Sequence, residues 1–283
     1  MSPFRIAAVA VPSIALGLGA VGYRRARASL ADAEAAWQKI AAASRPASAA
    51  FHPDMVAELP EIARRYFAHA IAPGTPLRTT VELEMRGTFL LGDRSGYQSY
   101  AMTARQILAP PKAFVWIPQM RSGAMRISGS DALVGTEAWT RFWLLGVIPV
   151  ANARSSPDLL RSATFRSAME GVWAPASLLP QQGVTWEQSG ADSARVTVRS
   201  VTPEIVLELT LASDGAVRTV AGQRWSNANP EGSFRLQPFG GTVEGEATFG
   251  GYTIPGRLKV GNHYGTGDYL PFFQAEIVRA RYL

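Results

Sequence analysis

The chain has 283 residues, of which 28 are basic and 22 acidic, so its formal net charge is +6. Hydrophobic residues make up 47% and charged residues 18%, a balance that supports a sizeable core and excludes general disorder. The absence of cysteine excludes disulfide frameworks, cysteine-ligated zinc, iron–sulfur clusters and thiol catalysis.

Most of the positive charge lies at the N-terminus. Residues 1–27 contain four arginines and no acidic residue, so the other residues carry a net charge of only +2. A nearly neutral body lacks the basic footprint that nucleic acids require. We therefore expect no nucleic-acid partner.

Residues 6–22 form an uncharged, largely apolar run of seventeen positions. About 20 apolar residues span a bilayer core, and Phe4 and Tyr23 could extend this run to the interfaces. We predict that residues 1–28 are a single-pass anchor in the bacterial inner membrane. Three arginines directly after the run are candidates for contact with anionic lipid head groups: Arg24, Arg25 and Arg27.

Two alternatives for this segment stay open. Ala26-Arg27-Ala28 has the pattern of a signal-peptide cleavage site, although arginines so close to the cut favour an uncleaved anchor. The flanking charges lean towards a cytoplasmic body by a single charge, so the side of the membrane is undecided. Residues 17–22 match G-x-G-x-x-G, but no strand precedes them, and we expect no cofactor.

Helical patterns follow the anchor. Ser29 and Asp32 form a capping pattern that predicts a helix over residues 30–43, and residues 44–52 resemble a linker, so we assign residues 29–54 to a helix and linker. A second helix is predicted from Leu59-Pro60-Glu61, with apolar residues at three- and four-residue spacings.

From about residue 78 the apolar period changes to two, which is typical of strands. Hairpin turns are predicted at 190–192, 214–215 and 250–251. A helix over 157–171 follows a Ser156 cap and separates about five strands from six or seven more. We predict an α+β fold for residues 55–283, in which a large curved antiparallel sheet forms a partial, unclosed barrel with a lid helix.

Several strings resemble a family of bacterial proteins of unknown function over residues 55–282. They are Leu59-Pro60 through His69-Ala70, Phe114-Val115-Trp116, the segments 144–150, 172–180 and 238–241, and Phe249–Pro255. This resemblance implies membership and no catalytic residues. In element order, the chain also resembles the periplasmic lipoprotein carriers, which implies an unclosed barrel with a helical lid over a hydrophobic cavity.

Aromatic and aliphatic residues of the body are candidates to line such a cavity. They are Trp116, Trp139, Trp143, Trp173, Leu207 and Leu209. Because Trp139 and Trp143 have the opposite parity to Phe142, both faces of region 138–150 are apolar. Both faces could be core, or one could line a ligand cavity.

Polar residues give a weaker signal. The candidates for a polar cleft are Glu244, Glu246, Arg257, Asn262 and His263. The pairs Glu82 with Glu84 and Glu244 with Glu246 have a spacing found in glycosidases, but the apolar residues between them favour solvated outer faces. No hydrolase, nucleotide-binding or zinc-protease motif occurs, and we assign no catalytic residue and no metal site.

These observations favour non-catalytic binding or transfer of an apolar ligand, such as a lipid or acyl chain, at the bacterial membrane. An interaction or regulatory envelope protein is the first alternative; it predicts an exposed apolar patch on the convex face and no cavity. A cryptic hydrolase is the second, and it requires the polar candidates to converge in one cleft. We name no protein partner.

Overall fold

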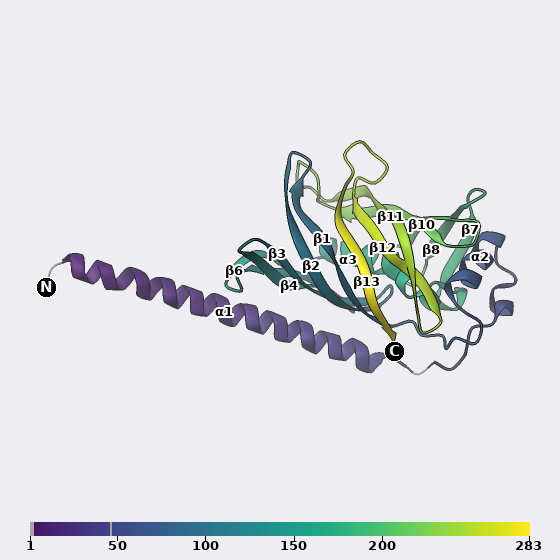
Figure 1. Ribbon diagram of the computed structural model, residues 1–283, viewed down its shortest axis with the longest axis horizontal. Helices are drawn as coiled ribbons and strands as arrows, with labels where there is room; N and C mark the ends of the chain where they lie inside the picture. Colours follow the sequence, from purple (N-terminus) through teal and green to yellow (C-terminus); the bar gives the residue numbers. More distant parts are fainter. Residues whose placement is uncertain (1–2, 46) are drawn as a thin grey trace.

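The computed structural model describes residues 3–45 and 47–283, with side chains from residue 19 onward (Figure 1). Helices α1 (Pro3–Ala43) and α2 (Glu61–Ala70), with the 3-10 turn η1 (Pro53–Val56) between them, precede the sheet. The first six strands are β1 (Val81–Asp93), β2 (Gly96–Ala109), β3 (Ala113–Ser122), β4 (Met125–Val134), β5 (Glu137–Leu144) and β6 (Ile148–Ala153).

A helical segment then separates these strands from seven more. It consists of α3 (Pro157–Met169) and the 3-10 turns η2 (Glu170–Trp173), η3 (Pro175–Leu178) and η4 (Pro180–Gln182). The remaining strands are β7 (Val184–Gln188), β8 (Ser193–Val198), β9 (Ile205–Leu211), β10 (Val217–Ser226), β11 (Arg235–Phe249), β12 (Tyr252–Asn262) and β13 (Leu270–Tyr282). The first group has six strands, one more than predicted.

All thirteen strands belong to one antiparallel sheet with the order β6-β5-β4-β3-β2-β1-β13-β12-β11-β10-β9-β8-β7. The pairing of β1 with β13 joins two meanders at the centre, so the first and last strands hold the molecule together. The edges β6 and β7 do not pair, and α3 with η2 to η4 connects them across the curved sheet. The predicted α+β fold with an unclosed antiparallel sheet is confirmed.

Local turn chemistry explains the second meander. The three predicted hairpins join β7 to β8, β9 to β10 and β11 to β12. Gly215 has φ +96° and lies against the backbone of α2, where a Cβ would meet the carbonyl oxygen of Arg65 at 2.3 Å. Glycine is needed there both for its conformation and for the close approach. Ser156 caps α3 as predicted, since its Oγ accepts a hydrogen bond from the Leu159 amide at 3.1 Å.

Helix α2 covers the end of the sheet where the β9–β10 and β11–β12 turns lie. Its buried face includes Tyr66 and Phe67, whose rings pack 5.0 and 5.3 Å from the ring of Trp186. The predicted amphipathic pattern is confirmed, because the helix buries the apolar side of its periodicity. This end of the barrel is filled by side chains.

Helix α1 is continuous through the predicted boundary between anchor and body. The prediction of a helix start at Ser29 is wrong, because Ser29 lies inside α1 and its Oγ makes no hydrogen bond among the described residues. The helix-forming residues on both sides favour continuation over a new start. The later part of α1 packs Ala33, Trp37 and Ile40 against the outer face of β2 to β5.

The earlier part of α1 projects beyond the sheet at the β6 side (Figure 1). Among the described residues, none of the helices combines the length and the apolar run that a membrane crossing requires. Most of the predicted span, residues 6–22, falls where side chains lie outside the described part of the chain. The predicted transmembrane helix is not confirmed.

Candidate functional site

A cavity of about 610 Å³ lies between the concave face of the sheet and the segment formed by α3 and η2. Its wall draws on strands from both meanders, because the sheet curls around the helix. Most of the lining side chains are aliphatic or aromatic, among them Phe89, Trp116, Met120, Phe142, Val172 and Trp173. The volume falls within the range of about 300–1,000 Å³ typical of small-molecule sites.

Aromatic rings form one side of the cavity. The ring of Trp116 lies 5.9 Å from Phe89, 6.2 Å from Phe142 and 6.1 Å from Phe273, measured between ring centroids. Phe89 in turn meets Phe272 edge to face at 5.4 Å. Such mixed tilted and edge-to-face contacts hold the rings in place along the cavity wall.

The wall also contains a polar corner, which we define as Asp131, Arg166, Glu170 and Arg224. Arg166 is ion-paired with Asp131 and donates from Nε to Glu170 at 2.7 Å. Thr140 donates to Asp131 at 2.7 Å. Burial alone lowers the pKa of Arg166, but the charges of Glu170 and Asp131 outweigh burial and raise it. This arginine therefore stays charged and is paired with two carboxylates.

Arg224 has a different environment. Its Nε donates to Ser162 Oγ at 3.0 Å, and its guanidinium carbon lies 4.8 Å from the ring centre of Phe239. Within the described structure, no carboxylate lies in ion-pairing distance of Arg224. Burial, and then the positive charge of Arg166, lower the pKa of Arg224 to about 10, and the charges of Asp131 and Glu170 oppose this shift only in part. The second arginine of the corner is thus incompletely compensated by protein groups.

A second hollow of about 1040 Å³ lies on the other side of α3, against β9 and β10. There the guanidinium of Arg161 lies 4.2 Å over the ring of Trp225, whose Nε1 donates to Asp158 at 2.7 Å. Phe239 contributes to both hollows. Helix α3 therefore separates two spaces, in keeping with the predicted position of a helix at the cavity.

The structure divides the predicted lining residues into two groups. Trp116 and Trp173 lie in the cavity wall. Trp139 is buried on the opposite face, in the outer cluster against α1, and Trp143 shares its parity.

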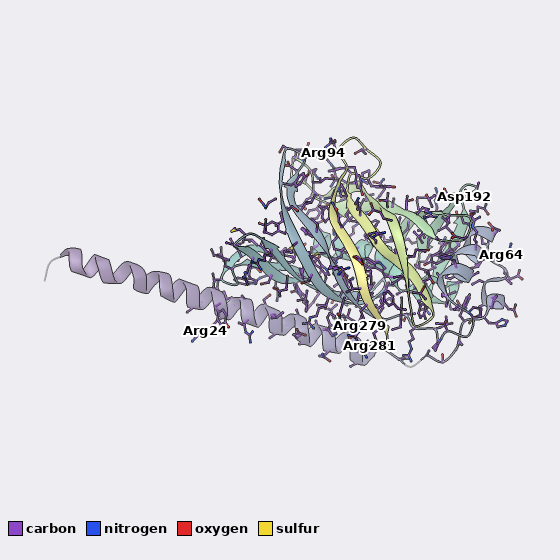
Figure 2. The ribbon with its side chains drawn as sticks, in the orientation of Figure 1. Arg24, Arg64, Arg94, Asp192, Arg279 and Arg281 are labelled. Carbon is purple, nitrogen blue, oxygen red and sulfur yellow. The ribbon has the colours of Figure 1, made fainter. Side chains whose placement is uncertain are left out.

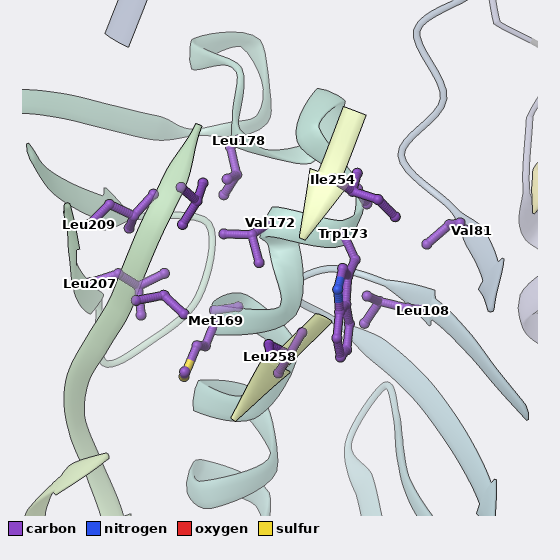
Figure 3. Close-up of a cluster of buried hydrophobic side chains, with 14 of the residues drawn as sticks. Val81, Leu108, Met169, Val172, Trp173, Leu178, Leu207, Leu209, Ile254 and Leu258 are labelled. Atoms are coloured by element: carbon purple, nitrogen blue, oxygen red, sulfur yellow. The ribbon is translucent and has the colours of Figure 1, made fainter. Parts of the chain in front are cut away.

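Leu207 and Leu209 also lie away from the cavity wall. Both are completely or almost completely buried in the filled core, near Met169 and Leu178 (Figure 3). Strand parity alone did not distinguish a packed face from a hollow one.

The predicted polar cleft does not form as one cluster. Glu244 pairs with Lys259 at 2.6 Å and Glu246 with His69 at 3.0 Å. His263 Nε2 lies 3.0 Å from the carbonyl oxygen of Ala228, in a turn where His263 has φ 60°. Arg257 is exposed, and Asn262 ends β12. Glu244, Glu246 and His263 each have a different partner, so these three do not form the single cleft that the hydrolase alternative requires.

Other polar candidates are also accounted for. Glu82 and Glu84 pair with Arg281 and Arg279 on the outer face, as favoured from sequence. Arg24, Arg25 and Arg27 are exposed on α1. In the part of the chain that the structure describes, no group of three His, Cys, Asp or Glu residues could hold a metal ion.

The polar corner was not predicted from the sequence, although a signal was present. Asp131 has the parity of Ile127 and Leu133 on β4, whose side chains are buried on the concave side. Arg224 likewise has the parity of Val220 on β10. A charged residue on the apolar face of a strand destabilises the fold unless it is paired with an opposite charge or binds a ligand. A charged residue at an apolar position of the alternating pattern can therefore indicate a polar site.

The fold and the cavity define a class of protein: an antiparallel half-barrel that encloses an apolar space beneath a helix. The chain belongs to a family of unknown function (DUF6544), whose model matches residues 49–275. This match confirms the predicted membership. No curated protein matches the chain.

The similar solved structures are distant. A LolA superfamily protein from Nitrosomonas europaea is 12% identical, with a TM-score of 0.37 over 78% of this chain and 92% of that chain. A domain from Vibrio parahaemolyticus assigned to outer-membrane lipoprotein sorting is 11% identical, with a TM-score of 0.38 over 78% and 91%. A DUF1329 family protein from Desulfovibrio piger is 8% identical, with a TM-score of 0.36 over 78% and 90%. These likenesses are too distant to assign a function.

Proposed function

We propose that the protein binds a long apolar ligand, such as an acyl chain of a lipid, inside the 610 Å³ cavity. The observation that carries this proposal is the apolar wall around an unfilled space. Protein interiors normally pack to the density of organic crystals, so a space of this size among aromatic and aliphatic side chains is suited to an apolar guest. The function is binding or transfer and involves no chemical step.

The alternative of an interaction protein has less support. It predicted an exposed apolar patch on the convex face and a closed interior. Instead α1 covers the apolar outer face of β2 to β5 with Ala33, Trp37 and Ile40, and the interior is hollow. The apolar-ligand proposal accounts for both observations.

The cavity opens near an apolar rim. Three turns lie at the same end of the sheet because they join successive antiparallel strands: β1–β2, β3–β4 and β5–β6. Six side chains at or beside these turns are 38–56% exposed, and we call them the apolar rim: Leu91, Tyr97, Met125, Leu145, Ile148 and Val150. Three of them, Leu91, Met125 and Val150, also line the cavity. Exposed apolar groups that continue into a cavity mark a contact surface.

Arginines of α1 and of the β1–β2 turn lie near the rim, and Arg94 also lies 4.0 Å from Asp268. Helix α1 passes the β5–β6 turn at Gly22, where a Cβ would lie 2.2 Å from the carbonyl oxygen of Val147. Arg24 and Arg25 follow on the exposed helix surface, and Arg94 lies at the β1–β2 turn (Figure 2). We propose that this end contacts an anionic bilayer, since each nearby arginine contributes about 1 kcal/mol of attraction. The bacterial inner membrane is the proposed location, which membrane fractionation tests.

Lipid extraction and native mass spectrometry of the full chain, purified without detergent, test the binding proposal. We expect a bound lipid, and a matched pair of variants locates it. Val260→Trp fills the cavity wall, whereas Val278→Trp adds the same side chain at an exposed position on β13. If the bound lipid is lost from Val260→Trp and kept by Val278→Trp, the result supports the cavity as the binding site. A lipid-free wild type that also fails to bind added fatty acid refutes the proposal.

Sedimentation with vesicles tests the rim. We expect the protein to bind vesicles containing phosphatidylglycerol, with weaker binding at high salt. The double variant Leu145→Asp with Ile148→Asp should lose most of this binding. Val278→Asp, which adds the same charge away from the rim, should retain it. Equal loss in both variants would contradict a specific role for the rim.

A further inference from the structure

The polar corner has an unequal distribution of hydrogen-bond partners. Both carboxylates are used twice: Asp131 accepts from Arg166 and Thr140, and Glu170 accepts from Arg166 and from Gln106 at 2.6 Å. Their acceptor oxygens are therefore directed at Arg166 and its neighbours. This arrangement stabilises one buried arginine and leaves the other outside the network.

Arg224 is that other arginine. A guanidinium has five N–H donors, and among the described residues only Ser162 accepts a hydrogen bond from Arg224. The four remaining donors belong to a side chain that lines the cavity. Arg224 is partly buried, and a cation in this position with a single neutral acceptor carries a desolvation penalty that is normally relieved by a paired anion.

The surroundings of Arg224 indicate the shape of the missing partner. Phe239 lies under the guanidinium at 4.8 Å and holds its plane, so the free N–H groups present a planar fork. Such a fork matches the two oxygens of a carboxylate or a phosphate through parallel hydrogen bonds. The rest of the wall is apolar, so the partner must be the charged end of an otherwise apolar molecule.

We infer that Arg224 binds the anionic head, a carboxylate or a phosphate monoester, of a single-chain amphiphile whose tail occupies the apolar part of the cavity. This inference rests on the proposed function and names its ligand class. Arg166, already paired with Asp131 and Glu170, positions the corner and does not contact the ligand head. The lowered pKa of Arg224 agrees with a site that is completed by an external anion.

Binding of four C16 probes to the full chain tests the inference: hexadecanoate, hexadecyl phosphate, hexadecanol and hexadecyltrimethylammonium. Because Trp116 and Trp173 line the cavity, tryptophan fluorescence reports occupancy. We expect at least one anion to bind about tenfold or more tightly than hexadecanol, the gain typical of a charge-assisted pair. Preference for hexadecanoate alone identifies a carboxylate ligand, and preference for hexadecyl phosphate alone identifies a phosphate ligand.

Variants at Arg224 assign the preference to this residue. Arg224→Gln should remove the preference and leave hexadecanol binding within about twofold of the wild type. Arg224→Lys keeps the positive charge but lacks the planar fork, so it should retain part of the preference for the anionic probes. It also keeps the test possible if Arg224→Gln does not fold. Arg218→Gln, on the same strand but exposed, is the matched control and should change nothing.

The outcomes separate the two proposals. If hexadecanol binds as tightly as both anions, or if Arg224→Gln keeps the anion preference, the inference is wrong while cavity binding stands. If the cationic probe binds most tightly, the carboxylates and not Arg224 set the specificity, and the inference is also wrong. If no probe binds, the proposed function fails and the inference fails with it.

Discussion

Strands β3 to β5 carry apolar side chains on both faces, and the two faces have different surroundings in the structure. On the outer face, Val115, Ile117 and Trp139 pack against Trp37 and its neighbours on α1. On the inner face, Trp116, Ile127 and Phe142 border the cavity. The same alternating pattern therefore leads to a closed core on one side and an unfilled space on the other. Apolarity shows that a face avoids water; it does not show what covers it.

The comparison implies that equivalent truncations on the two faces have unequal costs. Trp139→Ala should reduce the free energy of unfolding by about 3–5 kcal/mol, because it opens a cavity in the outer cluster. It also removes the hydrogen bond from Trp139 Nε1 to Ser130 Oγ at 2.9 Å. Urea denaturation measures the loss. A loss below about 1 kcal/mol would show that α1 does not form a true core with the sheet.

Alkaline pH probes the filled end of the concave side. Burial raises the pKa of Tyr66, and burial followed by the neighbouring Tyr252 raises the pKa of Tyr282. Because the folded pKa exceeds the unfolded value of about 10, this stability is complete below pH 10 and is lost as pH rises above it. Between its unfolded and folded pKa values, each tyrosine that stays protonated in the folded state lowers the free energy of unfolding by about 1.4 kcal/mol per pH unit. The lowered pKa of Arg224 acts in the opposite direction.

Urea midpoints at pH 9, 10 and 11 measure this dependence. Tyr66→Phe is the control, since it removes one buried phenol that makes no hydrogen bond in the described structure. Its midpoint should fall less steeply with pH than that of the wild type. An unchanged slope would mean that Tyr66 does not remain buried and protonated.

Phe142→Ala tests the hollow face and should cost less than Trp139→Ala. Phe142 is only partly buried and already borders open space, so we expect a loss of about 1 kcal/mol in unfolding free energy. Its ring contact with Trp116 at 6.2 Å accounts for part of that loss. Binding of hexadecanol should change, whereas Trp139→Ala should leave it nearly unchanged. Equal stability losses from the two variants would remove the distinction between the faces.

The smallest effect is expected at the exposed ion pair between Glu84 on β1 and Arg279 on β13. Glu84 and Arg279 are both exposed and lie 3.1 Å apart, so Glu84→Ala should cost about 0.5 kcal/mol or less. Glu82 is less exposed, and it accepts hydrogen bonds from Trp37 at 3.0 Å and from Arg281. Glu82→Ala should therefore cost more, about 1–2 kcal/mol. A reversed order in urea denaturation would contradict the role of Glu82 in docking α1.

Local signals predicted much of the fold. The sequence predicted the turns at Gly215 and Gly250, the Ser156 cap and the apolar face of α2. Each of these features depends on residues that are close together in the chain. The sequence pattern did not predict that α1 continues through Ser29. The capping pattern is weak, and α1 continues through Ser29 to Trp37, which contacts strands 45 or more residues away.

The candidate site was only half predictable. Of the residues predicted to line a cavity, Trp116 and Trp173 lie in its wall, whereas Leu207 and Trp139 have the same apolar pattern in sequence and lie in packed regions. Arg166 and Arg224 come from α3 and β10, and no short-range pattern links them to Asp131 on β4. Their meeting depends on how far the sheet curls around α3.

The sequence alone determined the order of helices and strands, the antiparallel class of the sheet and the family, because periodicity and turn chemistry act over a few residues. The tertiary structure decided which apolar face α1 covers, where space remains and which charges share the cavity wall. Those features depend on curvature and on the pairing of β1 with β13, which are set by contacts between residues up to about 200 positions apart. Arg224 illustrates the difference: its sequence position marks it as unusual, and only the fold places its free N–H groups inside an apolar cavity.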